Sequence, residues 1–220
     1  MRGSSISNIE FWVDLLNKME QEAKKRKAPV YTLNDNLTPF QHLITAILST
    51  RTRDEQTAKA AKKLFRVAKT PYDIVKLSVE QIDELIREVG FHRVKARKIK
   101  ELAEILISKC NSQVPSDFNE LIKLPGVGRK VANIVLARAF NIPAIAVDTH
   151  VHRISNRMGI VRTKSPEETE KALMRIVPRE LWARINKPFV GFGQTVCKPL
   201  KPLCNECPFK NCPKIGVKIS

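Results

Sequence analysis

Residues Leu124-Pro125-Gly126-Val127-Gly128-Arg129-Lys130 form a glycine turn between two helical patterns, and Asp148 follows 18 positions after Lys130. A glycine turn that opens onto a helix presents backbone N–H groups and the positive end of the helix dipole, which together bind phosphate. A lysine at such a helix start and a nearby carboxylate make a candidate nucleophile with an electrostatic partner. Taken alone, the pattern favours simpler interpretations, in which Lys130 contacts phosphate and Asp148 is a helix N-cap.

The chain on both sides of this turn has helical periodicity. Ser116 or Asp117 caps a short helix through Leu124, and a longer helix follows the turn until Pro143. Asp148 occupies an N-cap position ahead of a helix that ends near Met158. Elsewhere the apolar spacing and capping residues predict further helices. Their expected ranges are 9–26, 39 to about 50, 53 to about 67, 79 to about 90, 99–106, 166 to before Pro178, 181–185 and 189–195.

Three capping patterns mark where these helices begin. Thr38 and Gln41 form a capping box with proline at the first helical position, and Ser78 opens a similar one. Thr52 is expected to cap the helix that runs to about residue 67, and Gly90 is expected to end the helix opened by Ser78. No stretch alternates in the manner of a strand, and no Asn-Gly or Asp-Gly hairpin turn is present. The sequence therefore predicts an all-α protein.

The charge balance indicates a polyanionic partner. The chain of 220 residues has 39 Lys and Arg against 22 Asp and Glu, a formal net charge of +17. Nucleic acid is the first candidate and an acidic membrane surface the second, while a lysine-rich surface in a heat-adapted organism is the alternative. No apolar run approaches the ~20 residues of a membrane span, and no signal peptide is evident. We expect a soluble, intracellular protein, and a monomer by default because no additional amphipathic face stands out.

A basic segment of the chain is a further candidate for contact with a phosphate backbone. Arg93 and Lys95 belong to the stretch 91–98, which we expect to be a basic loop that opens a basic helix. Charge runs at helix starts are often only solvated, and an aromatic such as Phe91 in a loop is often a core anchor. The segment is nevertheless a candidate DNA contact.

Four cysteines near the C-terminal end form a candidate metal site. Cys197, Cys204, Cys207 and Cys212 have the spacing C-x6-C-x2-C-x4-C. A single zinc ion usually takes two C-x2-C pairs, and only Cys204 and Cys207 form one here. The compact spacing favours a [4Fe–4S] cluster over zinc, and disulfides rank third in a reducing compartment.

Taken together, these motifs resemble the endonuclease III family of DNA glycosylases. The helix–hairpin–helix turn 124–130, the segment Val147-Asp148-Thr149-His150-Val151 and the four-cysteine loop occur in the family's order. The resemblance extends from about residue 8 to residue 213 and implies two helical domains. One comprises residues 32–142 and contains the helix–hairpin–helix; the other combines residues 1–31 with 143–220 and carries the cluster loop at 197–212.

The resemblance implies specific roles for individual residues. Lys130 matches the catalytic lysine and Asp148 the essential aspartate, and the four cysteines match the ligands of a [4Fe–4S] cluster. Arg51 stands where typical bacterial members have a glutamine that fills the gap left by a flipped nucleotide, and Phe91 matches the second, apolar wedge. The DNA-contacting residues expected on this basis and from the basic patterns are Arg51, Phe91, Arg93, Lys95, Gly126, Gly128, Arg129 and His150.

The implied function is that of a bifunctional DNA glycosylase and AP lyase. Adenine-mismatch members typically have serine at the position of Lys130 and thymine-mismatch members tyrosine, so the lysine indicates action on oxidised or ring-saturated pyrimidines. The expected partner is double-stranded DNA with a damaged base or an abasic site. The alternatives are a mismatch or other-lesion glycosylase of the same superfamily, and a non-catalytic helix–hairpin–helix DNA-binding protein with a structural metal.

Overall fold

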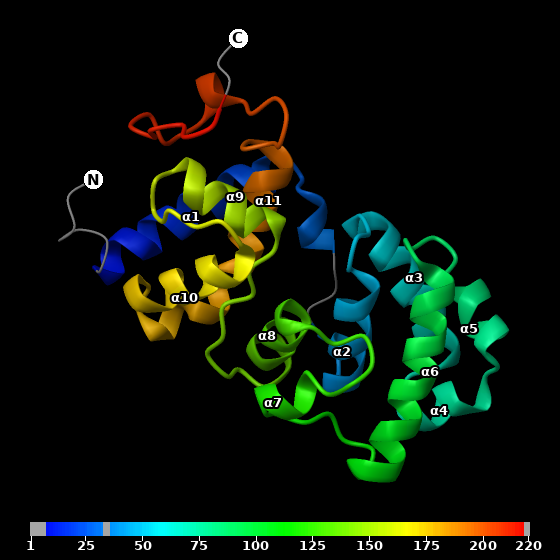
Figure 1. Ribbon diagram of the computed structural model, residues 1–220. Coiled ribbons are helices and arrows are strands. Elements are labelled where there is room, and N and C mark those ends of the chain that lie inside the picture. The colour runs from blue at the N-terminus through cyan, green and yellow to red at the C-terminus, as the bar shows by residue number, and fades with distance from the viewer. Residues whose placement is uncertain (1–7, 33–35, 218–220) are drawn as a thin grey trace. The chain divides into compact units, whose positions relative to one another are not determined.

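The computed structural model describes residues 8–32 and 36–217, and within these ranges the chain forms helices and turns without any strand. The all-α prediction is therefore confirmed. None of the described helices has both the length and the apolar character needed to cross a membrane. The chain divides into two compact units, Thr32–Ile142 and the combination of Met1–Tyr31 with Pro143–Ser220. The helices of each unit are labelled in Figure 1.

The unit Thr32–Ile142 consists of helices that pack mainly on α2 and α6. Helix α2 packs against α8 and α3, while α4 and α5 both pack against α6, as can be followed in Figure 1. The α2 helix begins at the predicted capping box, in which Thr38 and Gln41 satisfy each other's backbone N–H groups. The helices of this unit are α2 (Pro39–Leu48), α3 (Asp54–Val67), α4 (Pro71–Lys76), α5 (Val79–Leu85), α6 (His92–Lys109), α7 (Phe118–Leu121) and α8 (Arg129–Ala139).

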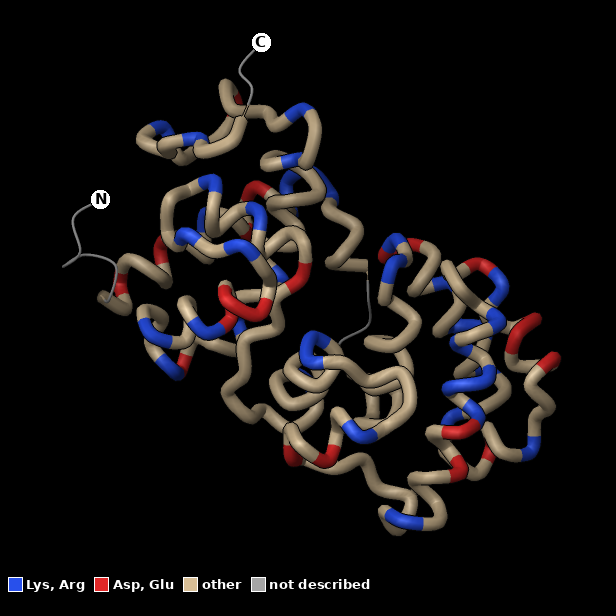
Figure 2. Tube along the Cα trace, viewed as in Figure 1, with Lys and Arg blue, Asp and Glu red and all other residues tan. Residues whose placement is uncertain are grey.

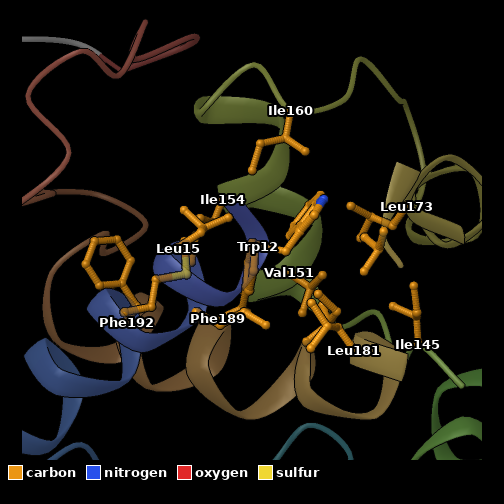
Figure 3. Close-up of a cluster of buried hydrophobic side chains, with 14 of the residues drawn as sticks. Trp12, Leu15, Ile145, Val151, Ile154, Ile160, Leu173, Leu181, Phe189 and Phe192 are labelled. Carbon is orange, nitrogen blue, oxygen red and sulfur yellow. The ribbon is translucent and has the colours of Figure 1, made fainter. Parts of the chain in front are cut away.

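The other unit is organised around α1 and α11, which pack along each other. Trp12 of α1 is fully buried, and its indole N–H donates to the carbonyl of Ile176 at 3.2 Å. Figure 3 shows Trp12 among apolar side chains of α9, α10 and α11, including Val151, Leu173 and Phe189. The elements are α1 (Ile9–Lys25), η1 (Pro29–Thr32), α9 (Thr149–Arg157), α10 (Pro166–Ile176), η2 (Arg179–Arg184), α11 (Asn186–Thr195) and η3 (Cys204–Glu206).

Two predicted helix boundaries are wrong for the same structural reason. Thr52 does not cap α3, because the helix begins one residue later than expected and its N-cap is Arg53, without a side-chain hydrogen bond. The α5 helix ends at Leu85 rather than at Gly90. Gly90 instead packs on the chain near Thr52, since a Cβ there would lie 2.7 Å from the carbonyl oxygen of Arg51. Thr52 and Gly90 are hydrogen-bonded to each other although they are far apart in sequence, and local sequence patterns cannot predict such a contact.

Two short segments also differ from the sequence-based expectation. Thr70 and Asp73 form a capping box that opens α4, a helix the periodicity did not predict because it is only six residues long. The helix expected over residues 181–185 is a 3₁₀ helix, η2, and α11 begins at Asn186 rather than at Phe189. These changes leave the predicted fold class intact.

Candidate functional site

The glycine turn joins α7 to α8 with the geometry of an anion-binding loop. Asp117 caps α7, so it rather than Ser116 is the N-cap of that helix. Gly126 has φ +81°, a left-handed conformation that glycine adopts at little cost. Gly128 is the N-cap of α8, contributes no side-chain cap, and has no atom within 4 Å of the place where a Cβ would lie. The first turn of α8 therefore has the open approach that a phosphate requires.

Lys130 is the second residue of α8 and lies directly behind this turn. Its side chain is half-buried, and its Nζ donates to Ser49 Oγ at 3.4 Å. Ser49 is the C-cap of α2, so the packing of α2 against α8 sets this contact. Nothing in the local sequence around Ser49 distinguishes it from an ordinary helix-ending serine, so this contact could not be predicted from the sequence.

Arg51 and Phe91, the two expected wedge residues, lie together on the surface of the same unit. Both are exposed, and the Phe91 side chain is 60% accessible although it is a large apolar group. The guanidinium carbon of Arg51 lies 5.6 Å from the centre of the Phe91 ring, within cation–π range. Both residues have positive φ, 50° for Arg51 and 58° for Phe91, which is uncommon for residues other than glycine. Such strained conformations are concentrated at functional sites.

Lys95 does not have the exposed position that a phosphate contact requires, which corrects the expectation for this residue. It is buried, with 5% of its surface accessible, and its ammonium group has three acceptors. Nζ donates to the carbonyls of Leu48 and Thr50 and to the hydroxyl of Thr52, at 2.8, 2.7 and 3.0 Å. Burial, with a smaller contribution from the charge of Lys130, lowers the pKa of Lys95 to about 8. The sequence pattern missed this because a lysine in a basic run is usually solvated.

Arg93 and Arg129, the other two basic residues of this unit that were expected to contact DNA, are exposed. Arg93 is exposed near the start of α6, which begins at His92, so the basic segment is helix rather than loop. Figure 2 shows Lys and Arg positions recurring along α6. Arg129 is also exposed, and its guanidinium carbon lies 4.8 Å from the centre of the Phe118 ring. Arg93 and Arg129 thus lie on the accessible surface of the unit.

In the unit that contains the N-terminal helix, Asp148 is the N-cap of α9, as its position in the sequence predicts. Its Oδ1 accepts hydrogen bonds from the backbone N–H groups of His150 and Val151, both at 2.9 Å. His150 is half-buried, and its Nδ1 lies 3.1 Å from Nη2 of Arg153. Arg153 Nη2 also donates to the carbonyl of Cys197 at 2.9 Å. Arg153, which sequence analysis missed, thus connects the Asp148 helix to the cysteine loop.

The four C-terminal cysteines border one pocket. All four are half-buried, and none forms a disulfide. Arg157 reaches the same loop, since its guanidinium donates to the carbonyls of Lys198 and Pro199, each at 2.6 Å. The pocket is lined by Arg157, Met158, Phe192, Val196, Cys197, Pro202, Leu203, Cys204, Cys207, Phe209, Cys212, Lys214 and Val217.

The chemistry of this donor set fits an iron–sulfur cluster. Burial raises the pKa of Cys207 and Cys212, and the neighbouring cysteines raise both further. Metal binding is what allows such clustered thiols to ionise together. Among the described residues, however, no group of three or more His, Cys, Asp or Glu side chains is arranged to hold a metal ion. The four free thiols and the apolar side chains around them are the donors and the surroundings that such a cluster uses.

Comparison with known proteins identifies relatives along nearly the whole chain. Residues 44–179 match the model of the HhH-GPD superfamily of base excision DNA repair proteins. Endonuclease III of Thermotoga maritima is 55% identical over 79% of this chain and 81% of its own, and that of Bacillus subtilis is 38% identical over 97% and 95%. The structure of a trapped covalent intermediate of an endonuclease III with DNA has a TM-score of 0.82 at 39% identity, covering 93% of this chain and 95% of its own.

Proposed function

This chain belongs to the endonuclease III family of HhH-GPD base excision DNA repair proteins, and we propose that it removes oxidised or ring-saturated pyrimidines from DNA. It is a DNA glycosylase and AP lyase of base excision repair. The proposal concerns the lesion, the residues that act and the cofactor. The observation that carries it is the presence of Lys130 in the first turn of α8, directly after the phosphate-type turn Gly126–Gly128.

We assign the nucleophile to Lys130. Its neutral amine attacks C1′ of the damaged nucleotide, and the glycosidic bond breaks with its electron pair leaving on the base, which takes up a proton. The sugar ring opens as the nitrogen forms a Schiff base with C1′. A general base then removes a proton from C2′, and the 3′ phosphate leaves by β-elimination. Hydrolysis of the Schiff base returns the lysine.

We assign the electrostatic role to Asp148. Positive charge develops on the sugar as the glycosidic bond breaks, and a carboxylate stabilises it. Asp148 Oδ1 already accepts two backbone hydrogen bonds at the start of α9, which hold the carboxylate in one orientation. The carboxylate thus combines a structural cap with a charge that the reaction requires.

The other contacts prepare the DNA for this reaction. The turn Gly126–Gly128 binds a phosphate through backbone N–H groups and sets the register without reading sequence. Arg51 and Phe91 fill the space left when the damaged nucleotide rotates out of the helix, a step that costs a few kcal/mol. Arg93, Arg129 and His150 contribute contacts to the phosphate backbone. The partner is double-stranded DNA, bound by a monomer; in a prokaryote this DNA is the nucleoid in the cytoplasm.

Cys197, Cys204, Cys207 and Cys212 are proposed to hold a [4Fe–4S] cluster. Four thiols that border one apolar pocket and are free of disulfides are the donor set such a cluster uses. When bound, the cluster crosslinks the loop 197–212 and fixes the basic residues on it. Arg157, the last residue of α9, donates to two carbonyls of this loop and thereby holds it in shape around the thiols.

Borohydride trapping on abasic-site DNA tests the function directly. The wild-type protein should form a covalent adduct, because borohydride reduces the Schiff base to a stable amine. Lys130→Ala should form none, while Lys18→Ala, which removes an exposed lysine paired with Asp14 in α1, should trap like wild type. An absent adduct in wild type, or an undiminished one in Lys130→Ala, would favour a non-catalytic DNA-binding protein.

A substrate panel tests the lesion class. Duplexes with an oxidised pyrimidine, an oxidised purine, a uracil or thymine mismatch, or an abasic site should be compared under single-turnover conditions. The oxidised pyrimidine should be excised at least tenfold faster than the other bases. Faster excision of mismatched uracil or thymine would replace the proposed specificity by that of a mismatch glycosylase.

A further inference from the structure

A set of hydrogen bonds joins the chain segments that carry Arg51 and Phe91. The hydroxyl of Thr52 accepts from the backbone N–H of Gly90 and from the ammonium of Lys95, both at 3.0 Å. The same ammonium donates to the carbonyls of Leu48 and Thr50. Thr52 therefore connects the segment after α2 with the segment that enters α6.

This connection uses the full hydrogen-bonding capacity of the groups involved. A hydroxyl can accept two hydrogen bonds and donate one, and the Thr52 hydroxyl also donates to the carbonyl of Thr50 at 3.2 Å. An ammonium has three donors, and all three of those on Lys95 have acceptors. The bonds from Lys95 are charge-assisted because their donor is an ammonium group. Because Lys95 is buried, they lie in a site that excludes water.

The bonded residues flank the two exposed side chains directly. Arg51 lies between Thr50 and Thr52, and Phe91 lies between Gly90 and the first residue of α6. The backbones also touch, since the Arg51 carbonyl lies so close to Gly90 that a side chain at position 90 would collide with it. Both Arg51 and Phe91 have left-handed backbone conformations, which persist only where surrounding contacts hold them.

We propose that Thr52 and Lys95 are positioning residues that hold Arg51 and Phe91 together as a preformed wedge for the space left by the flipped nucleotide. The inference rests on the proposed function and extends it to residues that do not touch the DNA. A wedge fixed before binding loses less conformational entropy when it enters the base stack than two loose side chains would. The stacking of the Arg51 guanidinium on the Phe91 ring is the arrangement that the buried bonds maintain.

Thr52→Val is the decisive substitution, because valine keeps the shape of threonine and removes the hydroxyl. Thr52→Ser restores the hydroxyl and should recover the activity. Thr45→Val is the matched control, since Thr45 belongs to neighbouring α2 and its buried hydroxyl has no hydrogen-bond partner among the described residues. Lys95→Met provides a second test at the other end of the same bond. Thermal unfolding of each variant shows whether it is folded.

Two activities should be measured on each variant. The first is single-turnover excision of 5,6-dihydrothymine from a duplex that has 2-aminopurine beside the lesion. The fluorescence of 2-aminopurine reports the unstacking of neighbouring bases when a wedge enters. The second is borohydride trapping on a preformed abasic site, where no base has to be displaced. Thr52→Val should excise about tenfold more slowly and give a smaller fluorescence change, while its trapping changes less than threefold.

The outcomes separate this inference from the function on which it rests. If the wild-type protein forms no borohydride-trapped adduct, the proposed function itself is wrong. If wild type traps but Thr52→Val excises at the rate of Thr45→Val, the positioning role is wrong and the function stands. The role would also be wrong if Thr52→Val lost excision and trapping equally, because that would indicate general damage to the protein. The same holds if Thr52→Ser is as slow as Thr52→Val. Recovery in Thr52→Ser with a slowed Lys95→Met supports it.

Discussion

Lys130 Nζ donates a hydrogen bond to Ser49 Oγ at 3.4 Å, across 81 positions of sequence. The two residues meet because α2 and α8 pack against each other, with Ser49 closing the first helix and Lys130 near the start of the second. The segment that Ser49 opens also carries Arg51 and Thr52. The proposed nucleophile therefore contacts the short segment that carries Arg51, one of the two proposed wedge residues.

Ser49→Ala should reduce the rate of the lysine chemistry only modestly. A hydrogen bond of 3.4 Å is long, so its loss should raise the activation free energy by only about 0.5–1 kcal/mol. The rate should then fall about two- to fivefold. The rate of adduct formation with abasic-site DNA measures this. Ser108→Ala is the control, because Ser108 bonds only carbonyls of its own helix, α6. A Ser49→Ala rate equal to that of Ser108→Ala would show that the contact does not matter for the reaction.

Asp148→Asn should separate the cap from the charge. An asparagine oxygen can still accept from the N–H groups of His150 and Val151, so the free energy of unfolding should change by less than about 0.5 kcal/mol. Excision should nevertheless fall by at least about 100-fold, because the developing positive charge loses its partner.

Asp117→Asn is the matched control for Asp148→Asn. Asp117 caps α7 with the same pair of backbone contacts, at 2.8 and 3.0 Å, and has no assigned role in the chemistry. It should retain both stability and excision. Near-wild-type excision in Asp148→Asn would contradict the role of the carboxylate.

Gly126→Ala and Gly128→Ala should affect different properties. Alanine at Gly126 would be forced to φ +81°, which should destabilise the protein by about 1–2 kcal/mol. Alanine at Gly128 meets no atom within 4 Å, so stability should change little, but its methyl group would obstruct the approach of a phosphate. Urea unfolding and DNA-binding isotherms measure the two effects. Unchanged affinity in Gly128→Ala would argue against a phosphate at this turn.

Stability should depend on pH through Lys95. Burial lowers the pKa of Lys95 to about 8 in the folded protein, against an ordinary value of 10.5, and Lys130 is the charged group that acts on it. Between these values the folded protein binds fewer protons than the unfolded chain, so this group makes the free energy of unfolding rise with pH. Below about pH 8 both states are protonated and the contribution is constant.

Lys95→Met removes this dependence. The difference in unfolding free energy between wild type and Lys95→Met should therefore increase in favour of wild type from pH 7 to pH 10. Urea titrations at several pH values measure it, with the exposed Lys18→Met as baseline. A difference that is flat, or that falls as pH rises, would contradict the buried position of the ammonium group.

Arg157→Lys should weaken retention of the proposed cluster. The guanidinium binds two carbonyls of the cysteine loop at once and lies 3.7 Å from Cys197 Sγ, and an ammonium cannot reproduce this fork. Purified Arg157→Lys should have less iron and less visible absorption than wild type, and lose both faster with a chelator. Arg179→Lys, an exposed substitution in η2, is the control. A colourless wild-type protein containing zinc would replace the cluster by a zinc site.

Helix composition and the order of motifs could be predicted from the sequence, because capping and periodicity act within one turn of helix. The capping boxes at Thr38 and Ser78 and the N-cap at Asp148 are confirmed, and the chain is all-helical in the described ranges. Lys130 and Asp148 were recognisable as candidates because each belongs to a local motif.

Tertiary packing sets which polar groups from distant parts of the sequence form hydrogen bonds with each other. Thr52 has the sequence position of a helix cap and Lys95 that of a solvated lysine, yet the Lys95 ammonium donates to the Thr52 hydroxyl. The other hydrogen bonds of both side chains are to backbone groups of neighbouring segments. Arg51 and Phe91 adopt left-handed backbone conformations that no local preference favours. The physical reason is that burial requires every polar group to find a partner, and the partner is set by helix packing rather than by neighbouring residues. The sequence alone determined the helices and the chemistry they carry; packing determined which groups meet.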